Sequence, residues 1–241
     1  MKPTVGTFLS IGSPVIVELA SLSGFDWVLI DLEHGSGSES AMPDQLRALR
    51  GSKTQGIVRV GAPHPDLIAR VLDWGAHGIM VPHVNSPAEA EQIVQAAHYS
   101  PRGHRGFSRT VRAHDYGLRS PEQSPAAVIM AQIETIEGVN HAAEIGQIEG
   151  VAVLFVGPAD LQHELSHRSA AAPGDFAECL NIVVAAAKSA GKEAGILVRD
   201  PADLPHYLAL GFTRIAIDSD LSILRRSWQE TLSLSILRTE P

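Results

Sequence analysis

The chain has few of the features that mark secreted, membrane or nucleic-acid-binding proteins. It contains one cysteine, Cys179, so neither an internal disulfide framework nor a cysteine-based zinc site can form. Its 19 lysines and arginines are outnumbered by 27 aspartates and glutamates, and the formal net charge of -8 argues against a surface for nucleic acid or anionic lipid. No apolar run approaches the roughly 18 residues of a membrane span, and Glu18 and several glycines interrupt the apolar N-terminal stretch that a signal peptide needs. We therefore expect a cytoplasmic globular protein.

Eight short apolar runs, rich in valine and isoleucine, recur along the 241 residues. Each is apolar at consecutive positions, which is typical of a parallel strand that is buried on both faces. The runs are Thr4–Leu9, Trp27–Leu32, Gly56–Val60, Gly78–Val81, Ala127–Ile133, Val151–Val156, Ala194–Val198 and Arg214–Ile217. Between them lie segments such as Pro87–His98 and Ala177–Ala190, whose apolar residues recur at intervals of three and four and predict helices.

The regular alternation of strand and helix predicts a (β/α)8 TIM barrel, an α/β fold in a single domain over residues 1–241. The alternative, an open doubly wound sheet, would ordinarily carry a G-x-G-x-x-G fingerprint after its first strand, and Ser10-Ile11-Gly12-Ser13-Pro14 does not match it. The arginine-rich segment Tyr99–Gln123 is the longest stretch without clear periodicity. It is therefore a candidate functional loop.

Polar residues gather where several of the predicted strands end, which is the active end of a TIM barrel. The strand-end segments are Asp31-Leu32-Glu33-His34, Arg59, Pro82-His83, Gln132-Ile133-Glu134 and Gly157-Pro158-Ala159-Asp160. A charged group at the end of an apolar strand loses hydration unless another group pairs with it. We expect these side chains to converge on one mouth.

Glu134 and Asp160 are the candidate metal ligands. Two carboxylates without cysteine form a hard, oxygen-rich site that suits Mg²⁺ or Mn²⁺ and leaves coordination positions for water and a bidentate substrate. The alternative is that each carboxylate caps the helix that follows its strand, because carboxylates favour helix N-termini in any protein. The spacing alone leaves both interpretations open.

His34 and Arg59 are the candidate catalytic residues. An imidazole titrates near neutrality and would serve as a general base at the mouth, although most of the eleven histidines must have simpler roles in loops. A guanidinium on a buried strand needs an anionic partner. That partner would be a substrate carboxylate or enolate, or it would be Glu33 or Asp31 in a structural ion pair.

The segment His163-Glu164-Leu165-Ser166-His167 matches the H-E-x-x-H pattern of zinc proteases. That pattern requires a helix that presents both histidines on one face, together with a third ligand. Because the segment starts a connection after a strand and precedes an Ala/Pro/Gly stretch, we treat a zinc hydrolase using His163 and His167 as a weak alternative.

Lysine is scarce, and this scarcity limits the chemistry available. The four lysines are Lys2, Lys53, Lys188 and Lys192, and none of them ends a predicted strand. Schiff-base chemistry on a keto substrate is therefore disfavoured. Enolate chemistry in this barrel would have to use a metal.

The ordered motifs resemble the metal-dependent pyruvate aldolases of the HpcH/HpaI family from about Thr4 to about Leu224. The matching segments are Phe25-Asp26-Trp27-Val28-Leu29-Ile30-Asp31-Leu32-Glu33-His34, Val58-Arg59-Val60, Leu72-Asp73-Trp74-Gly75-Ala76, Val81-Pro82-His83-Val84, Pro101-Arg102-Gly103-His104-Arg105-Gly106, Gln132-Ile133-Glu134 and Phe155-Val156-Gly157-Pro158-Ala159-Asp160-Leu161. Any one segment is weak evidence, whereas the ordered set is specific.

The resemblance implies a class II aldolase that reversibly cleaves a 4-hydroxy-2-oxo acid to pyruvate and an aldehyde. By analogy with the family, Glu134 and Asp160 would bind the divalent metal, Mg²⁺ or Mn²⁺ with Co²⁺ as a further candidate. Arg59 would contact the C2 oxygen of the keto acid. His34 would be the acid/base, and Asp73 would orient it.

The resemblance also assigns substrate-binding residues and an assembly. The backbone amides of Ala159 and Asp160 would hold the pyruvate carboxylate, Gln132 would hold a metal-bound water, and Leu197 would line the substrate site. The family exchanges its last helix between subunits, usually in a hexamer, a trimer of dimers with sites at the dimer interface. The expected partners are therefore a small-molecule substrate and other copies of this chain, with no nucleic acid or membrane.

Four departures from the family pattern bear on the substrate. Ser100 replaces a frequent proline, Asp218 lies where glycine is usual, His83 lies where an apolar residue is usual, and Gly35-Ser36-Gly37-Ser38 is an unusually small version of its loop. None of them removes a proposed catalytic group. A barrel that binds a keto acid without turning it over stays an alternative, but a binder would not need an acid/base histidine.

Overall fold

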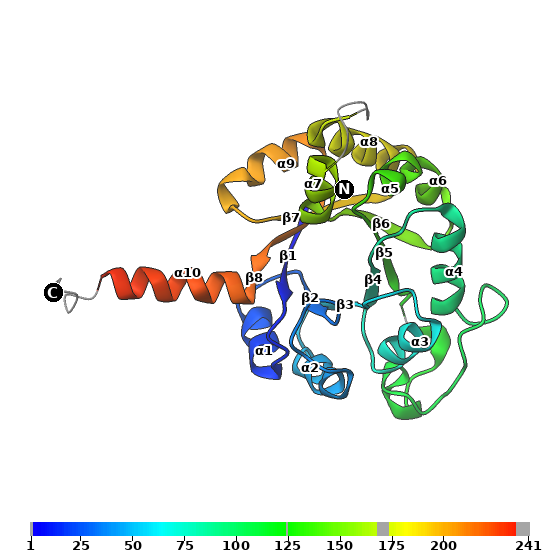
Figure 1. The fold of residues 1–241 in the computed structure, drawn as a ribbon. Helices are drawn as coiled ribbons and strands as arrows, with labels where there is room; N and C mark the ends of the chain where they lie inside the picture. Colours follow the sequence, from blue (N-terminus) through cyan, green and yellow to red (C-terminus); the bar gives the residue numbers. More distant parts are fainter. Residues whose placement is uncertain (1, 124, 168–173, 235–241) are drawn as a thin grey trace.

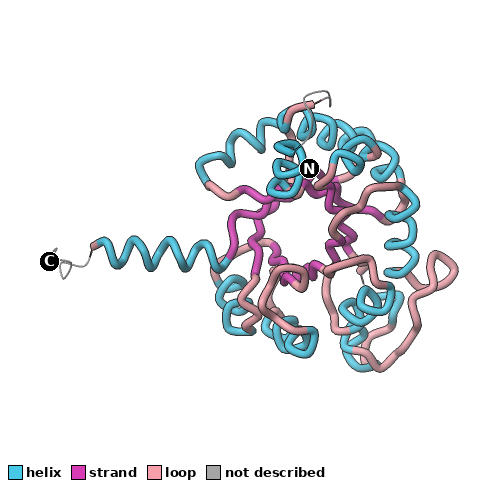
Figure 2. The backbone as a smooth tube through the Cα atoms, in the orientation of Figure 1, coloured by secondary structure: helices cyan, strands magenta, loops and turns pink. Residues whose placement is uncertain are grey.

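The computed structural model describes residues 2–123, 125–167 and 174–234, and eight parallel strands form a closed barrel in it. Every strand pairs with its neighbours in chain order, and β8 closes against β1. Figure 2 shows the ring of strands inside a ring of helices. The predicted (β/α)8 fold is confirmed.

The first half of the barrel runs from β1 to α4. Its elements are β1 (Thr4–Leu9), α1 (Pro14–Leu22), β2 (Trp27–Asp31), α2 (Met42–Ala48), β3 (Gln55–Arg59), α3 (Pro65–Asp73), β4 (Gly78–Val81) and α4 (Pro87–Ala97). Proline begins most of these helices, where its missing N–H costs nothing. At α4, Ser86 and Glu89 add a capping box, which fixes where that helix starts.

The second half follows the long loop after α4. Its elements are β5 (Val128–Ile133), α5 (Ile136–Asn140), α6 (Ala142–Gln147), β6 (Val151–Val156), α7 (Pro158–His167), α8 (Phe176–Ser189), β7 (Glu193–Val198), α9 (Leu204–Leu210), β8 (Arg214–Ser219) and α10 (Asp220–Ser233). Gly211 ends α9 with a φ of 110°, a left-handed conformation in which glycine carries no side-chain penalty.

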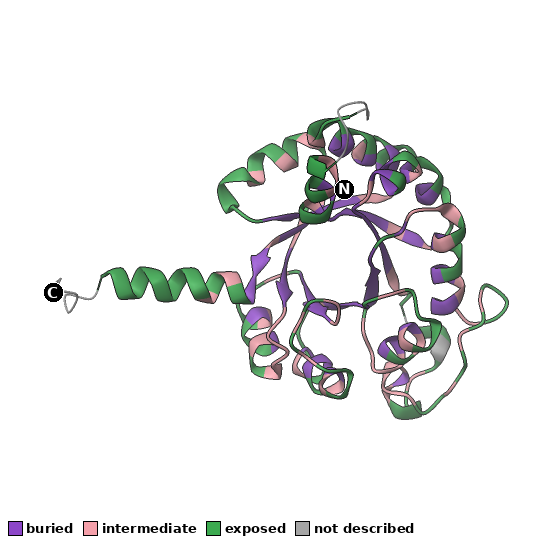
Figure 3. Ribbon diagram, viewed as in Figure 1, coloured by how far each residue is buried: buried purple, intermediate pink, exposed green. Residues whose placement is uncertain are grey.

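Two apolar clusters hold the barrel together. The larger lies between the strands and the surrounding helices, and the smaller fills the barrel interior. The interior cluster consists of Phe8, Trp27, Leu29, Ile57, Met80, Met130, Val153, Phe155, Leu197 and Ala216. Figure 3 shows the strands as the buried part of the molecule. The interior is therefore a packed core, and ligands can reach only its ends.

Helix α10 leaves the barrel and projects away from it (Figure 1). Only Asp220, its first residue, is buried, whereas Leu221, Trp228 and Leu232 are at least half exposed. An amphipathic helix is ordinarily stable because its apolar face is covered. Within the described part of the chain, no helix is long and apolar enough to cross a membrane.

Candidate active site at the barrel mouth

The alternation of side chains along each strand places the polar strand ends at the mouth. Leu29 and Ile57 face the barrel interior, so Asp31 and Arg59, two residues further along, face the same way. Met130 likewise leads to Gln132 and then Glu134. The C-terminal ends of all eight strands lie at one end of the barrel, so these groups share one mouth, as the sequence predicted.

Arg59 is the best-defined group of the mouth. Its Nε and Nη2 donate to the two carboxylate oxygens of Asp31 at 2.9 and 2.8 Å, and its Nη1 lies 2.7 Å from Glu33 Oε2. Asp31 stands directly opposite Arg59 in the register of β2 and β3. Burial opposes the guanidinium charge, but Asp31, Glu33 and Glu134 outweigh it and raise the pKa of Arg59.

These contacts show that the structural ion pair expected as an alternative does form. They do not engage all of the hydrogen-bond donors of the guanidinium, which carries five N–H groups. Two of them donate to Asp31, and Nη1 forms an ion pair with Glu33. One N–H on each terminal nitrogen is left for an incoming oxygen, so pairing and substrate binding are compatible.

Asp31 also shapes the turn that carries His34. Its Oδ1 accepts the backbone N–H groups of Glu33 at 3.0 Å and His34 at 3.3 Å. The His34 side chain is 70% exposed, and its Nε2 lies 3.9 Å from Glu33 Oε2. The imidazole is therefore at the mouth and accessible, as a general base must be.

Glu134 is buried beside Gln132 and His83. The Gln132 Nε2 donates to its Oε2, and the backbone N–H of His83 donates to its Oε1 at 2.8 Å. The His83 Nδ1 lies 3.4 Å from the same oxygen. Burial raises the pKa of Glu134, and the negative charges of Asp160 and Glu33 raise it further.

The helix-capping alternative for Glu134 is wrong. The residue that caps α5 is Thr135, whose hydroxyl accepts the N–H of Gly138 at 3.0 Å. Glu134 instead faces the mouth, in range of the charge of Asp160. Asp160 is exposed in the first turn of α7. This position is compatible both with a carboxylate that stabilises the start of the helix and with a metal ligand.

Gly157 is a site residue that the sequence reasoning missed. It directly follows β6, and a Cβ on it would lie 2.3 Å from Glu134 Oε2 and 2.9 Å from Gln132 Nε2. Any larger residue would displace the carboxylate. A glycine directly after an apolar strand was the available signal, because such a glycine often marks a close approach.

The start of α7 supplies backbone donors. The first intrahelical bond runs from Leu161 N to Gly157 O, so the N–H groups of Ala159 and Asp160 belong to the first turn, where helices leave donors without an intrahelical acceptor. Such a helix start favours anions. Leu197 contributes the apolar floor inside the barrel.

The expected contact between Asp73 and His34 is not made within the chain. Asp73 ends α3, next to the start of β4, and therefore lies at the opposite end of the barrel from His34. It pairs there with Arg105. Its proposed orienting role stays a prediction that would need a second subunit.

The zinc-protease pattern does lie on a helix, contrary to our expectation. His163 and His167 are on α7 with ring centroids 4.3 Å apart, both exposed. Glu164, the base of that pattern, accepts the backbone N–H of Ile136 instead. Within residues 2–123, 125–167 and 174–234, no three His, Cys, Asp or Glu side chains are grouped to hold a metal, so this pair has no third ligand there.

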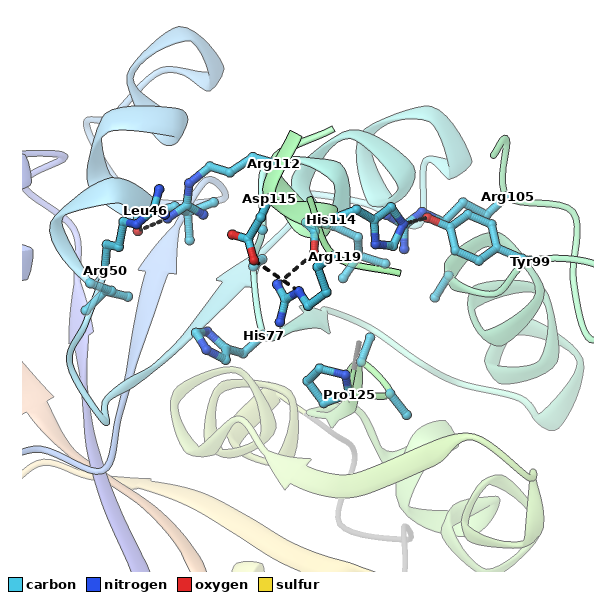
Figure 4. A pocket seen from close by; sticks show the side chains of 18 of the residues that line it. Leu46, Arg50, His77, Tyr99, Arg105, Arg112, His114, Asp115, Arg119 and Pro125 are labelled. Carbon is cyan, nitrogen blue, oxygen red and sulfur yellow. Dashed lines mark hydrogen bonds and ion pairs between the residues drawn. The ribbon is translucent and has the colours of Figure 1, made fainter. Parts of the chain in front are cut away.

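The candidate functional loop Tyr99–Gln123 lies at the opposite end of the barrel. It covers a cavity of about 450 Å³ beside the starts of β3, β4 and β5 (Figure 4). Arg112 fastens the loop, because its Nη1 and Nη2 donate to the carbonyl oxygens of Trp74 and Leu46 at 2.7 and 3.0 Å. The loop is therefore not part of the mouth of its own chain.

The family model described as HpcH/HpaI aldolase/citrate lyase matches residues 4–227. The chain belongs to this family. A curated relative, 5-keto-4-deoxy-D-glucarate aldolase of Shigella dysenteriae, is 36% identical over 94% of this chain and 90% of the relative. This family membership makes the chain a carbon–carbon lyase of the aldolase type.

Solved structures agree with the fold. An HpcH/HpaI aldolase/citrate lyase family protein from Burkholderia cenocepacia is 34% identical, with a TM-score of 0.89 over 96% of this chain and 94% of that one. The citrate synthase SbnG is 28% identical, with a TM-score of 0.82 over 96% of this chain and 92% of that one.

Proposed function

We propose that this lyase cleaves a 4-hydroxy-2-oxo acid to pyruvate and an aldehyde, and that it catalyses the reverse condensation. The observation that carries the proposal is the mouth itself, where Arg59 keeps two N–H groups unused beside the buried Glu134. The similarity to 5-keto-4-deoxy-D-glucarate aldolase supports a 4-hydroxy-2-oxo acid as the substrate class.

The residues present fit a divalent cation. Glu134 is buried, and burial and the negative charge of Asp160 both raise its pKa. The Oε1 of Gln132 is buried without a hydrogen-bond partner. Ionised carboxylates in this position would gain from a hard cation, which oxygen ligands select. Glu134 and Asp160 would hold Mg²⁺ or Mn²⁺, which would supply Lewis acidity toward the C2 oxygen.

The side chains of the mouth would divide the remaining work. The N–H groups of Ala159 and Asp160 would bind the substrate carboxylate, and the free N–H groups of Arg59 would donate to the C2 oxygen. His34 would take the proton of the C4 hydroxyl. The C4–O bond then becomes a carbonyl, the C3–C4 bond breaks, and its electron pair passes toward C2 and its oxygen. Return of a proton to C3 completes pyruvate.

We propose further that the working enzyme is a cytoplasmic oligomer of this single-domain barrel, in the family's hexameric form. The uncovered apolar residues of α10 support exchange of that helix with another copy. The position of Asp73 supports it as well, because Asp73 reaches a His34 only from a neighbouring subunit. Analytical ultracentrifugation of the full chain and of a variant ending at residue 219 tests the role of α10.

A pyruvate-release assay on a panel of 4-hydroxy-2-oxo acids tests the activity. We expect turnover with Mg²⁺ or Mn²⁺, loss of turnover in EDTA and recovery on adding the metal back. Turnover that persists in EDTA would contradict the metal site, and absence of pyruvate from every substrate would contradict the aldolase assignment. Binding of pyruvate without turnover would favour the keto-acid-binding alternative.

A double variant separates the zinc-hydrolase alternative from the aldolase. Changing His163 and His167 to alanine removes an exposed ring pair of α7 and leaves Glu134, Asp160 and Arg59 in place. We expect pyruvate release to persist in this variant. Loss of all activity would revive the hydrolase.

A further inference from the structure

The cavity under the loop Tyr99–Gln123 lies at the end of the barrel opposite the mouth. It is bordered by the residues before β3, β4 and β5, which lie at the N-terminal ends of these strands. The mouth lies at their C-terminal ends. The packed interior cluster separates the two ends, so a ligand in this cavity would not touch His34, Arg59 or Glu134 of the same chain.

The cavity wall is strongly basic. Arg50, Arg105, Arg112 and Arg119 line it, whereas Asp115 is the only carboxylate among its described lining residues. This composition contrasts with the formal net charge of -8 of the chain. A concave wall of one charge sign concentrates counter-ions of the other sign.

Two of these guanidinium groups are not neutralised by a carboxylate. Arg119 pairs with Asp115, and Arg105 pairs with Asp73. Arg112 donates only to carbonyl oxygens, and the side chain of Arg50 has no hydrogen-bond or ion-pair partner among the described residues. The cavity therefore holds two positive charges in excess.

His77 adds a neutral donor between these groups. Its Nδ1 accepts the backbone N–H of Gly56 at 3.1 Å, so the proton of the neutral ring lies on Nε2. Burial lowers the pKa of His77, and the charges of Arg112 and Arg119 lower it further. Figure 4 shows His77 below Arg119, with Arg50 and Arg112 to one side.

The loop above the cavity is held in an unusual backbone conformation. Asp115 and Tyr116 are consecutive non-glycine residues with φ values of 48° and 58°. Such residues occur at functional sites more often than elsewhere, because the surrounding structure must hold them in place. The strain lies in the segment that carries Arg112, Asp115 and Arg119, so it concerns the wall of the cavity.

From this arrangement we propose that the cavity binds a small, doubly charged oxyanion, the phosphate of a phosphorylated metabolite or a short dicarboxylate. Arginines recognise both groups through paired N–H donors, and His77 Nε2 offers one more. The ligand would join Arg50, on the barrel side, to Arg112 and Arg119 of the loop. Binding would thus stabilise the loop without altering the mouth.

Calorimetric titration of the intact protein with inorganic phosphate and separately with malonate tests the proposal. The chloride concentration is adjusted to keep ionic strength equal. We expect saturable binding of at least one anion, and the tighter of the two identifies the source. NMR signals of the His77 ring should shift over the same concentration range. Failure of both anions to bind, or binding that leaves His77 unchanged, would overturn the proposal.

Two single variants, Arg50→Gln and its control Lys53→Gln, show where the anion binds. Arg50→Gln removes an unpartnered cation from the cavity wall, and Lys53→Gln removes the same charge three residues away, outside the cavity. We expect Arg50→Gln to weaken binding about tenfold or more, as for one charge-assisted hydrogen bond. Lys53→Gln should bind as the parent does. Equal effects of the two variants would show nonspecific electrostatic attraction of the anion and would refute the site. Pyruvate release should be unchanged in both variants.

Discussion

Replacing Arg59 should cost both stability and rate, and the structure allows the two to be separated. Arg59→Ala deletes two charge-assisted hydrogen bonds to Asp31 and an ion pair with Glu33, and it leaves these two carboxylates with side chains only 2% and 13% exposed. Breaking a buried ion pair from one side costs about 3–5 kcal/mol. For a chain of this size, about 1 kcal/mol shifts the melting temperature by roughly 2–4 °C. We therefore expect melting to fall by roughly 6–20 °C.

Arg59→Lys keeps the charge but not the planar fork. A lysine can point its ammonium at one carboxylate, but it cannot donate to both oxygens of Asp31 and to Glu33 in the same geometry. Melting should therefore fall less than in Arg59→Ala. Pyruvate release should still fall about 10²–10³-fold, the usual effect of removing one donor from a developing oxyanion.

Circular dichroism melts and the pyruvate-release assay measure the two effects. The control is Arg70→Ala, because Arg70 makes an equally short 2.8 Å pair with Glu39 while both side chains are about half exposed. An exposed pair contributes at most about 1 kcal/mol. If Arg59→Ala and Arg70→Ala lower the melting temperature equally, burial does not determine how much an ion pair contributes to stability. If Arg59→Lys retains the parent rate, the unused N–H groups do not contact the reacting oxygen.

Three further predictions concern Glu134, Gly157 and Arg112. Because the pKa of Glu134 is raised in the folded state, the free energy of unfolding of the metal-free protein should fall as pH rises above the ordinary pKa of glutamate. Glu134→Gln should remove this pH dependence, raise the metal-free melting temperature at pH 7 and abolish Mn²⁺ binding. Scanning and titration calorimetry measure these effects. Gly157→Ala should weaken Mn²⁺ affinity at least about tenfold and cost about 1–3 kcal/mol, since its Cβ would meet Glu134 Oε2; unchanged affinity in a titration would contradict this geometry. Arg112→Ala should speed proteolysis within Tyr99–Gln123 because two carbonyl contacts are lost, whereas cleavage at the parent's rate would show that Arg112 does not fasten the loop.

The strands were predictable because burial on both faces leaves a nearly continuous apolar run. The bounds of Thr4–Leu9, Gly78–Val81 and Val151–Val156 coincide with β1, β4 and β6. β8 was predicted two residues too short, since it continues through the polar Asp218 and Ser219. Asp218 has a φ of 54° at an irregularity in the pairing with β1, so hydrophobicity could not reveal it. Glycine adopts that left-handed conformation without a side-chain penalty, which agrees with the glycine that the family resemblance led us to expect there.

The membership of the site was more predictable than its pairings. Strand parity and a common sheet edge bring Asp31, Arg59 and Glu134 to one mouth from sequence alone. Which carboxylate would neutralise Arg59 depended on the register of β2 and β3, which places Asp31 directly beside it. The position of Asp73 followed from topology, since the end of α3 returns to the start of β4, but its ion pair with Arg105 depended on the path of an irregular loop.

The two ends of the barrel differ in the charged groups that they present. At the mouth, Asp31 and Glu33 pair with Arg59, and burial together with the negative charges of Asp160 and Glu33 raises the pKa of Glu134. A 2-oxo acid is itself an anion, so the cation that we propose at Glu134 and Asp160 would also favour its binding. At the opposite end, burial lowers the pKa of His77, and the positive charges of Arg112 and Arg119 lower it further. The proposed cation site and the proposed anion site thus lie at opposite ends of one barrel, and the packed interior keeps the two apart.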